Sequence, residues 1–168
     1  EKDVDVLSGT SLSRTTKVLP PPVGALIAII RGSLVTPQGD EESLAGWYFG
    51  NKAVSVVGLG TLVGKPISTW LLGKSTELHL LDKGSDLSVL KKSDVIILGT
   101  GVPHLIKNSM IAKKSLVVDF GYGKLGGSLA GDLDPKRLAN TIDYTPTPGG
   151  TGPILIACLL RNFYVLNG

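Results

Sequence analysis

The glycine-rich turn Gly58-x-Gly60-x-x-x-Gly64 constrains the fold of this chain more than any other part of the sequence. A short apolar run at residues 54–57 precedes it and predicts a strand buried on both faces, and an amphipathic run at 67–72 predicts a helix after it. In such a unit, the first glycine permits a tight turn, the second lets a pyrophosphate approach the backbone, and the third lets the helix pack against the strand. The N-terminus of the helix then offers N–H groups and a positive dipole end to the phosphates.

An acidic residue at the end of the next predicted strand strengthens this interpretation. Residues 78–81 are predicted to form that strand, and Asp82 follows directly. A carboxylate at this place accepts hydrogen bonds from both ribose hydroxyls of an adenosine, which favours NAD. It repels the 2′-phosphate of NADP unless the neighbouring Lys83 compensates. Two alternatives stay open: an ordinary strand-to-helix turn, because the last two glycines are one residue further apart than is common, and Asp82 as a turn residue only.

Size and composition exclude several classes of protein. The chain has 168 residues, 42% of them hydrophobic, which fits one domain with a substantial core. Its net charge of +3 is scattered rather than gathered in a basic stripe, so we expect no nucleic-acid partner. The longest apolar runs are too short to span a bilayer, and no cluster of residues has metal-ligand spacing. The single cysteine, Cys158, is expected to be a small buried hydrophobe in a reducing cytoplasm.

Predicted strands alternate with predicted helices from Ala53 onward, which indicates a Rossmann-like, doubly wound parallel sheet in a single domain. Residues 1–17 are polar and are interpreted as a segment outside this domain, which occupies residues 18–168. An apolar helix is expected to start at Val23, with Pro22 near its N-terminus, and a short helix near Asp40. The remaining strands are expected at 53–57, 77–81, 94–98, 116–119 and 142–144, and the remaining helices at 64–73, 86–91, 108–112, 134–139 and 152–165.

Three further loops should meet the glycine turn at the carboxyl edge of the sheet. The loops are residues 99–103, 120–123 and 144–153, and each follows a predicted strand. All three contain glycine, and two contain proline. Several glycine-rich turns on one edge favour a ligand site, since ligands bind at the carboxyl ends of parallel strands. Simple strand termination is the alternative, and it is preferred for Gly123, Gly126 and Gly127.

The run Thr145-Pro146-Thr147-Pro148-Gly149-Gly150-Thr151-Gly152-Pro153 resembles the C-terminal signature of the methylenetetrahydrofolate dehydrogenase/cyclohydrolase family, T-P-x-P-G-G-x-G-P before a helix. Other segments match the family in order along nearly the whole chain: residues 2–5 its K-D-V-D segment, 58–66 its glycine loop, 118–122 its D-V-G-I loop and 131–134 its G-D-V segment. Asn162 also fits.

This resemblance implies a two-domain enzyme that oxidises 5,10-methylenetetrahydrofolate with NAD(P) and hydrolyses the methenyl product to 10-formyltetrahydrofolate. The chain corresponds to the cofactor domain. The family's Y-x-x-x-K lysine belongs to an N-terminal domain, and no lysine here matches it, so the chain alone is not expected to catalyse either step. The resemblance also implies tetrahydrofolate derivatives and that N-terminal domain as partners, and a homodimer formed through the cofactor domains.

The family's functional positions carry over to two groups of residues, with no catalytic residue and no metal ligand among them. The dinucleotide group is Gly58, Leu59, Gly60, Thr61, Val63, Gly64, Asp82, Lys83, Thr100, Gly101, Val102, Pro103, Gly121, Tyr122 and Thr145. The folate group is Asp5, Pro148, Gly149, Gly150, Gly152, Pro153 and Ile154.

Departures from the family's pattern limit the resemblance at three places. The residues after Asp5 differ from the family's D-G-[FL]-H, so Asp5 could be only a solvated acid. The family's P-C-T-P-x-G segment could correspond to residues 19–24 or 34–39, and the apolar helix that follows favours 19–24. Leu59 and Gly60 replace the Arg and Ser that can favour NADP, which tilts the prediction to NAD. A non-catalytic nucleotide-binding module and another NAD-linked dehydrogenase are the alternative functions.

Overall fold

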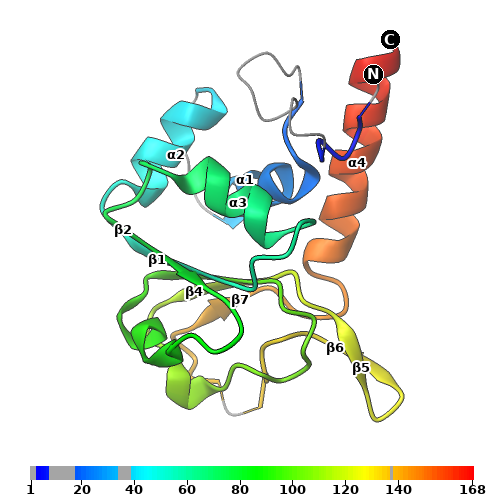
Figure 1. Cartoon of the computed structure of the whole chain (residues 1–168). Helices are drawn as coiled ribbons and strands as arrows, with labels where there is room; N and C mark the ends of the chain where they lie inside the picture. Colours follow the sequence, from blue (N-terminus) through cyan, green and yellow to red (C-terminus); the bar gives the residue numbers. More distant parts are fainter. Residues whose placement is uncertain (1–2, 8–17, 34–38, 137) are drawn as a thin grey trace.

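Five parallel strands form the central sheet of the computed structural model, which describes residues 3–7, 18–33, 39–136 and 138–168 (Figure 1). The strand order is β2-β1-β3-β4-β7, so the chain leaves β1 in one direction to form β2 and then crosses to the other side of β1 to form β3. The strands are β1 (Ala53–Val57), β2 (Glu77–Leu81), β3 (Val95–Leu98), β4 (Leu116–Asp119) and β7 (Asp143–Tyr144). The predicted Rossmann-like parallel sheet is confirmed.

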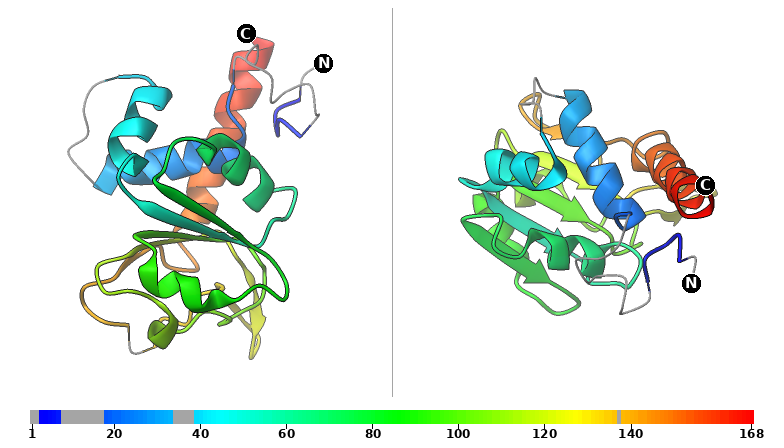
Figure 2. Two further views of the ribbon diagram at one scale, coloured as in Figure 1. Left: turned by 60° about the vertical axis from the view of Figure 1, so that its left-hand side comes forward. Right: turned by 90° about the horizontal axis from the view of Figure 1, so that it is seen from above.

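Alternate residues of the central strands enter two separate cores, as the two-residue period of a strand requires. In β3, Val95 and Ile97 belong to the core under three α-helices, whereas Ile96 and Leu98 belong to the core on the opposite face. The helices of the first face are α1 (Pro21–Ser33), α2 (Glu41–Phe49) and α3 (Gly64–Leu71), which lie together above the sheet (Figures 1 and 2). The other face is covered by the 3₁₀ helices η1 (Leu87–Lys92) and η2 (Asn108–Met110) and by loops.

The C-terminal helix α4 (Thr151–Asn167) packs beside α1 and holds the N-terminal segment. Its Asn162 side chain donates hydrogen bonds to the carbonyl of Val4 at 3.0 Å and to that of Leu19 at 2.8 Å. The two helices approach closely at Gly24 of α1, where an added Cβ would lie only 3.2 Å from the sulfur of Cys158. Cys158 is half-buried rather than buried, and partial burial raises the pKa of its thiol.

Helix α1 starts at Pro21, two residues before the expected start at Val23, and so begins within residues 19–24. Residues 34–38 of the alternative segment lie outside the described residues. Proline suits a first helical turn because the missing N–H would have no partner there. Helix α2 begins after Asp40, whose side chain accepts the Ser43 N–H at 2.8 Å, and the short helix expected there is confirmed. The division between residues 1–17 and 18–168 stays a prediction, because 8–17 lie outside the described residues.

Three expected elements on the second face differ from the structure. The segments at 86–91 and 108–112 form the 3₁₀ helices η1 and η2 rather than α-helices. The predicted helix at 134–139 is wrong for 134–136 and 138–139, where no helix occurs. There the Asp134 N–H donates to Ile106 O and the Ala139 N–H to Asn108 Oδ1, so these donors serve neighbouring segments instead of a helix.

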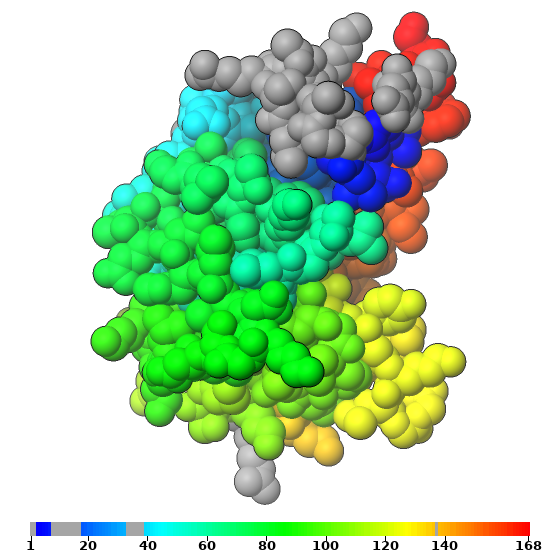
Figure 3. All heavy atoms as spheres, in the orientation of Figure 1, coloured from blue at the N-terminus to red at the C-terminus, as the bar shows by residue number. Residues whose placement is uncertain are grey.

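A β-hairpin that the sequence did not predict projects from the body of the protein (Figures 1 and 3). It pairs β5 (Gly123–Leu125) with β6 (Ser128–Ala130) in antiparallel register. Gly126 and Gly127 form its turn with φ of +58° and +85°, the conformation that a tight two-residue hairpin turn needs. These glycines therefore make a hairpin turn, which is more than the strand termination preferred from the sequence.

None of the helices among the described residues meets the length and hydropathy needed to cross a membrane.

Candidate functional site

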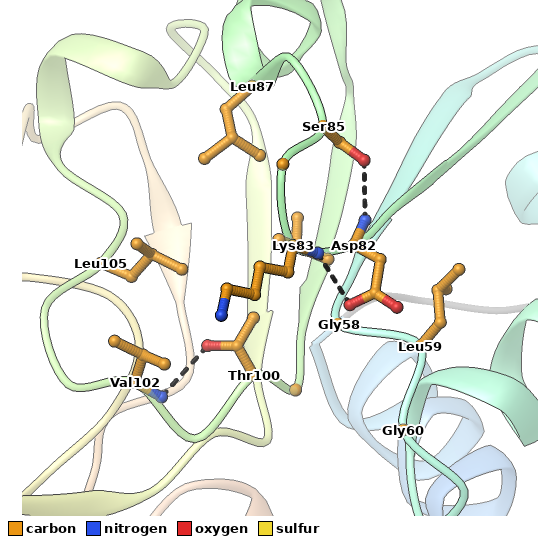
Figure 4. Close-up of a pocket in the computed structure, with 13 residues that line it drawn as sticks. Gly58, Leu59, Gly60, Asp82, Lys83, Ser85, Leu87, Thr100, Val102 and Leu105 are labelled. Atoms are coloured by element: carbon orange, nitrogen blue, oxygen red, sulfur yellow. Dashed lines mark hydrogen bonds between the residues drawn. The ribbon is translucent and has the colours of Figure 1, made fainter.

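A cleft of about 630 Å³ opens at the carboxyl ends of β1, β2 and β3, where the strand order reverses (Figure 4). Its size suits a small ligand, and parallel sheets bind ligands at this switch point. The lining residues are Val57, Gly58, Leu59, Gly60, Asp82, Lys83, Gly84, Ser85, Leu87, Gly99, Thr100, Val102 and Leu105.

A second hollow of about 290 Å³ continues the cleft toward the end of β4. Gly60, Gly99 and Thr100 line both hollows, so the two hollows lie side by side along the carboxyl edge of the sheet. The second hollow is also lined by Thr61, Leu62, Val63, Gly101, Phe120, Gly121 and Tyr122. We call the two hollows together the strand-end groove. It brings together twelve of the predicted dinucleotide residues, namely Gly58, Leu59, Gly60, Thr61, Val63, Asp82, Lys83, Thr100, Gly101, Val102, Gly121 and Tyr122.

The three glycines of the first turn have different surroundings. Gly58 has a φ of +89°, and a Cβ there would lie 2.7 Å from the Gly99 carbonyl oxygen. A Cβ on Gly64 would collide with the carbonyl of Gly58, so this glycine lets α3 pack closely against the turn that follows β1. A Cβ on Gly60 would meet no atom within 4 Å. The fold thus explains the first and last glycines, while the open space at Gly60 faces the groove.

The start of α3 offers fewer free donors than the sequence suggested. The Lys65 N–H donates to the carbonyl of Gly60 at 3.0 Å, and Pro66 has no N–H. These two positions therefore have no free N–H to offer to a ligand.

Asp82 lies at the edge of the cleft, at the end of β2, with its carboxylate exposed (Figure 4). Its Oδ1 accepts the Lys83 N–H at 2.9 Å, and its own N–H donates to Ser85 Oγ at 2.9 Å, so a tight turn fixes the backbone around it. The Lys83 side chain extends into the cleft (Figure 4). The cleft is therefore lined by both Asp82, the residue expected to favour NAD, and Lys83, the residue expected to offset the 2′-phosphate of NADP.

Two buried carboxylates support the groove from below, and neither was predicted as a site residue. Asp132 is fully buried, and its Oδ2 accepts the Thr100 N–H at 2.6 Å, the Thr100 hydroxyl at 2.8 Å and the Gly101 N–H at 3.3 Å. Asp119 is buried at the end of β4, and its two oxygens accept the N–H groups of Gly121 at 2.8 Å and Leu133 at 2.9 Å.

The pKa of Asp119 is raised to about 6, chiefly by burial and in addition by the nearby Asp132, against the lowering effect of the N–H donors. The sequence contained both residues within family motifs, but they are 13 positions apart and no local pattern shows that they meet.

Three predicted dinucleotide residues lie outside the walls of the groove. Gly64 packs under the glycine turn. Pro103 lies against Gly123, where a Cβ would come 2.6 Å from its ring. The Thr145 hydroxyl accepts the Asp119 N–H at 2.8 Å, and Thr145 lines a separate hollow of about 230 Å³ beside the hairpin.

The predicted folate residues other than Asp5 gather at the turn into α4 but do not line the strand-end groove. The Thr147–Pro148 peptide is cis, Gly149 has a φ of +97°, and the Gly150 N–H closes the turn on the Pro146 carbonyl at 2.9 Å. Gly152 and Pro153 lie in the first turn of α4, and Ile154 packs against the core shared with α1. The Thr151 hydroxyl donates to the Asp119 carbonyl at 2.8 Å and joins this turn to the end of β4.

Asp5 is exposed. The carbonyl of its neighbour Val4 accepts a hydrogen bond from Asn162, about three turns along α4. The contact of Asp5 with folate stays a prediction. Among the described residues, no group of three or more His, Cys, Asp and Glu side chains is arranged to hold a metal ion.

A doubly wound parallel sheet with a glycine turn and a groove at its switch point defines a domain of the Rossmann-like, dinucleotide-binding class. Residues 41–167 match the model of one family within this class, described as tetrahydrofolate dehydrogenase/cyclohydrolase, NAD(P)-binding domain. The chain belongs to this family.

Relatives and solved structures agree with this assignment. Bifunctional protein FolD of Aquifex aeolicus is 36% identical over 152 residues, covering 85% of this chain and 52% of that protein. The FolD protein of Wolinella succinogenes is 34% identical over 96% of this chain and 55% of its own length. The crystal structure of the bifunctional FolD enzyme of Campylobacter jejuni superimposes with a TM-score of 0.81 at 26% identity, over 98% of this chain and 57% of that one. The chain thus spans about half the length of the curated relatives it matches.

Proposed function

We propose that this chain binds the dinucleotide of an enzyme that oxidises 5,10-methylenetetrahydrofolate and hydrolyses the resulting methenyl group to 10-formyltetrahydrofolate. The bound nicotinamide would accept a hydride from the methylene carbon, and water would then add to the methenyl cation with loss of a proton. The chain's own contribution is to bind and orient the cofactor. The observation that carries the proposal is the strand-end groove, in which Gly60 is open toward the ligand space while Asp82 lies at the cleft edge.

The same residues favour NAD over NADP. The exposed carboxylate of Asp82 can accept both ribose hydroxyls, and it opposes a 2′-phosphate. Lys83 is the residue that could reverse this preference, because it extends into the same cleft and could neutralise the phosphate. A solved relative from Trypanosoma brucei, 25% identical with a TM-score of 0.78, is described as complexed with NADP, so the preference needs a direct test on this chain.

The test is calorimetric titration of the chain with NAD and, separately, with NADP, for the wild type and for Asp82→Asn. This substitution keeps an oxygen for the Lys83 N–H and removes the charge. We expect it to weaken NAD binding about tenfold, the loss of one charge-assisted hydrogen bond, and to leave NADP binding unchanged or tighter.

Asp86→Asn is the matched control, because Asp86 caps η1 nearby and does not line the cleft. Equal NAD affinity of Asp82→Asn and the wild type would contradict the ribose contact. Tighter NADP than NAD binding by the wild type, abolished by Lys83→Ala, would reverse the cofactor and keep the family.

The folate site and the wider assembly belong to the same proposal. We expect the Pro148–Ile154 region and Asp5 to contact folate only together with a domain that carries the catalytic lysine, and we expect a homodimer in the cytoplasm. Sedimentation measures the oligomeric state of the chain. Assay of a protein that includes the catalytic domain, by formation of reduced cofactor from 5,10-methylenetetrahydrofolate, tests the oxidation.

A further inference from the structure

We propose that Asp132 is a positioning residue that fixes the Thr100–Gly101 backbone as the shared wall of the strand-end groove. This inference rests on the proposed dinucleotide function, and it assigns a role to a residue that does not itself line the groove. Thr100 lines both hollows and Gly101 the second, so their conformation determines whether the two hollows form one continuous groove.

The hydrogen bonds show how Asp132 holds this loop. One oxygen, Oδ2, accepts two backbone N–H groups and one hydroxyl from Thr100 and Gly101, at 2.6, 3.3 and 2.8 Å. Bonds of this kind to a charged acceptor are about twice as strong as neutral ones. The Thr100 hydroxyl in turn accepts the Val102 N–H at 3.1 Å, so the bonds continue into the wall of the first hollow (Figure 4).

The protein holds Asp132 itself by the backbone on either side of it. The Gly131 carbonyl accepts the His104 N–H and the Asp132 carbonyl accepts the Ile106 N–H, each at 2.9 Å, while Ile106 and Leu133 form a parallel bridge. The segment therefore lies along residues 104–106 through one isolated bridge, and this pairing fixes the backbone from which the Asp132 carboxylate extends.

Gly121 packs against the same carboxylate. A Cβ on Gly121 would collide with the Asp132 carboxyl group, so only glycine at this position lets the carboxyl group pack against the backbone that lines the second hollow. Asp132 thereby contacts the loops that follow both β3 and β4. Its other oxygen, Oδ1, is buried and has no hydrogen-bond partner among the described residues, so the whole donor set is concentrated on Oδ2.

This asymmetry provides a discriminating pair of variants. Asp132→Asn can keep an oxygen at the Oδ2 position and all three hydrogen bonds, whereas Asp132→Ala removes them. Asp134→Asn is the matched control, since this acid lies two residues along and lines neither hollow. Hydrogen exchange of the Thr100 and Gly101 amides, followed by NMR without ligand, reports the loop, and titration with NAD and NADP reports its consequence.

We expect Asp132→Ala to speed exchange at Thr100 and Gly101 at least tenfold and to weaken dinucleotide binding about tenfold or more. Asp132→Asn should lie between Asp132→Ala and the wild type in both measurements, because it keeps the acceptor oxygen and loses the charge. The control should remain within about threefold of the wild type. Wild-type exchange at the two amides in a folded Asp132→Ala protein would overturn the proposal, and so would faster exchange with unchanged affinity.

If Asp132→Ala does not fold, the wild type decides the question. A scalar coupling across the hydrogen bond between the Thr100 amide nitrogen and the Asp132 carboxyl carbon supports the proposal, and absence of that coupling overturns it. Failure of the wild type to bind either dinucleotide would contradict the proposed function and with it the role of the groove, while the exchange data would still decide whether Asp132 holds the loop.

Discussion

Substituting alanine at Gly64 or at Gly60 separates what the fold requires of the glycine turn from what a ligand requires. A Cβ on Gly64 would overlap the Gly58 carbonyl oxygen and would lie 2.8 Å from the Gly58 carbonyl carbon and 2.9 Å from Leu59 Cα. All three are backbone atoms, so no side chain can rotate away. Overpacking of this kind costs about 1–3 kcal/mol or more, and we expect Gly64→Ala to lie at or above the upper end, near 3 kcal/mol.

Gly60→Ala should behave in the opposite way. No atom lies within 4 Å of the added methyl group, and the backbone conformation there is open to other residues. Its cost in stability should be below about 1 kcal/mol. The methyl group would nevertheless project where a pyrophosphate must approach the backbone, so NAD(P) affinity should fall at least tenfold.

Urea unfolding at neutral pH measures the stability of both variants, and calorimetric titration measures their affinity. We expect the two variants to differ in opposite ways. Gly64→Ala should be strongly destabilised, whereas Gly60→Ala should have normal stability and weak NAD(P) binding. A Gly60→Ala protein that binds NAD and NADP like the wild type would refute the close approach at this turn. A Gly64→Ala protein of wild-type stability would refute the packing argument.

Three further substitutions test the structure by urea unfolding. Burial raises the pKa of Asp119 from its ordinary 3.8 to about 6, so its contribution to stability is complete below about pH 4 and is lost as the pH rises through 6. The wild type's excess in free energy of unfolding over Asp119→Asn should therefore decrease by up to about 3 kcal/mol between about pH 4 and pH 7. A difference that stays constant with pH would contradict the raised pKa. Asn162→Ala should cost about 2 kcal/mol, because two backbone carbonyls lose their donor; no loss would mean that water replaces it. Ser55→Ala should cost only about 1 kcal/mol, since the buried Ser93 hydroxyl keeps its bond to Val89 O, and a loss of about 3 kcal/mol would show that this second bond does not compensate.

The parallel sheet could be predicted from the sequence because its signals are local. Residues 95–98 are a continuous apolar run, and residues 54–57 are apolar except for the buried Ser55, which is typical of strands buried on both faces. The glycine turn follows residues 54–57 directly. Asp82 was found for the same reason, since it stands at the end of its strand and the parallel register brings that end beside Gly58.

The supports of the groove could not be predicted because they join distant residues. Thr100 and Asp132 are 32 positions apart, and Asp119 meets Leu133 across 14 positions. The predicted helix at 134–139 failed for a related reason, because its backbone donors bind Ile106 and Asn108 rather than one another. The hairpin had a local signal in Gly126-Gly127, but its strands are too short for a two-residue alternation to stand out.

The bond between Asn162 and Val4 joins segments that are 158 positions apart, and this has a practical consequence for engineering. A short peptide linker could join the segment at residues 3–7 to the end of α4, and the exposed turn at Gly126–Gly127 could supply new termini. Such a circular permutant would leave every strand of the parallel sheet uncut. It would also move the point of attachment of a fused reporter to the tip of the hairpin, at the carboxyl edge of the sheet.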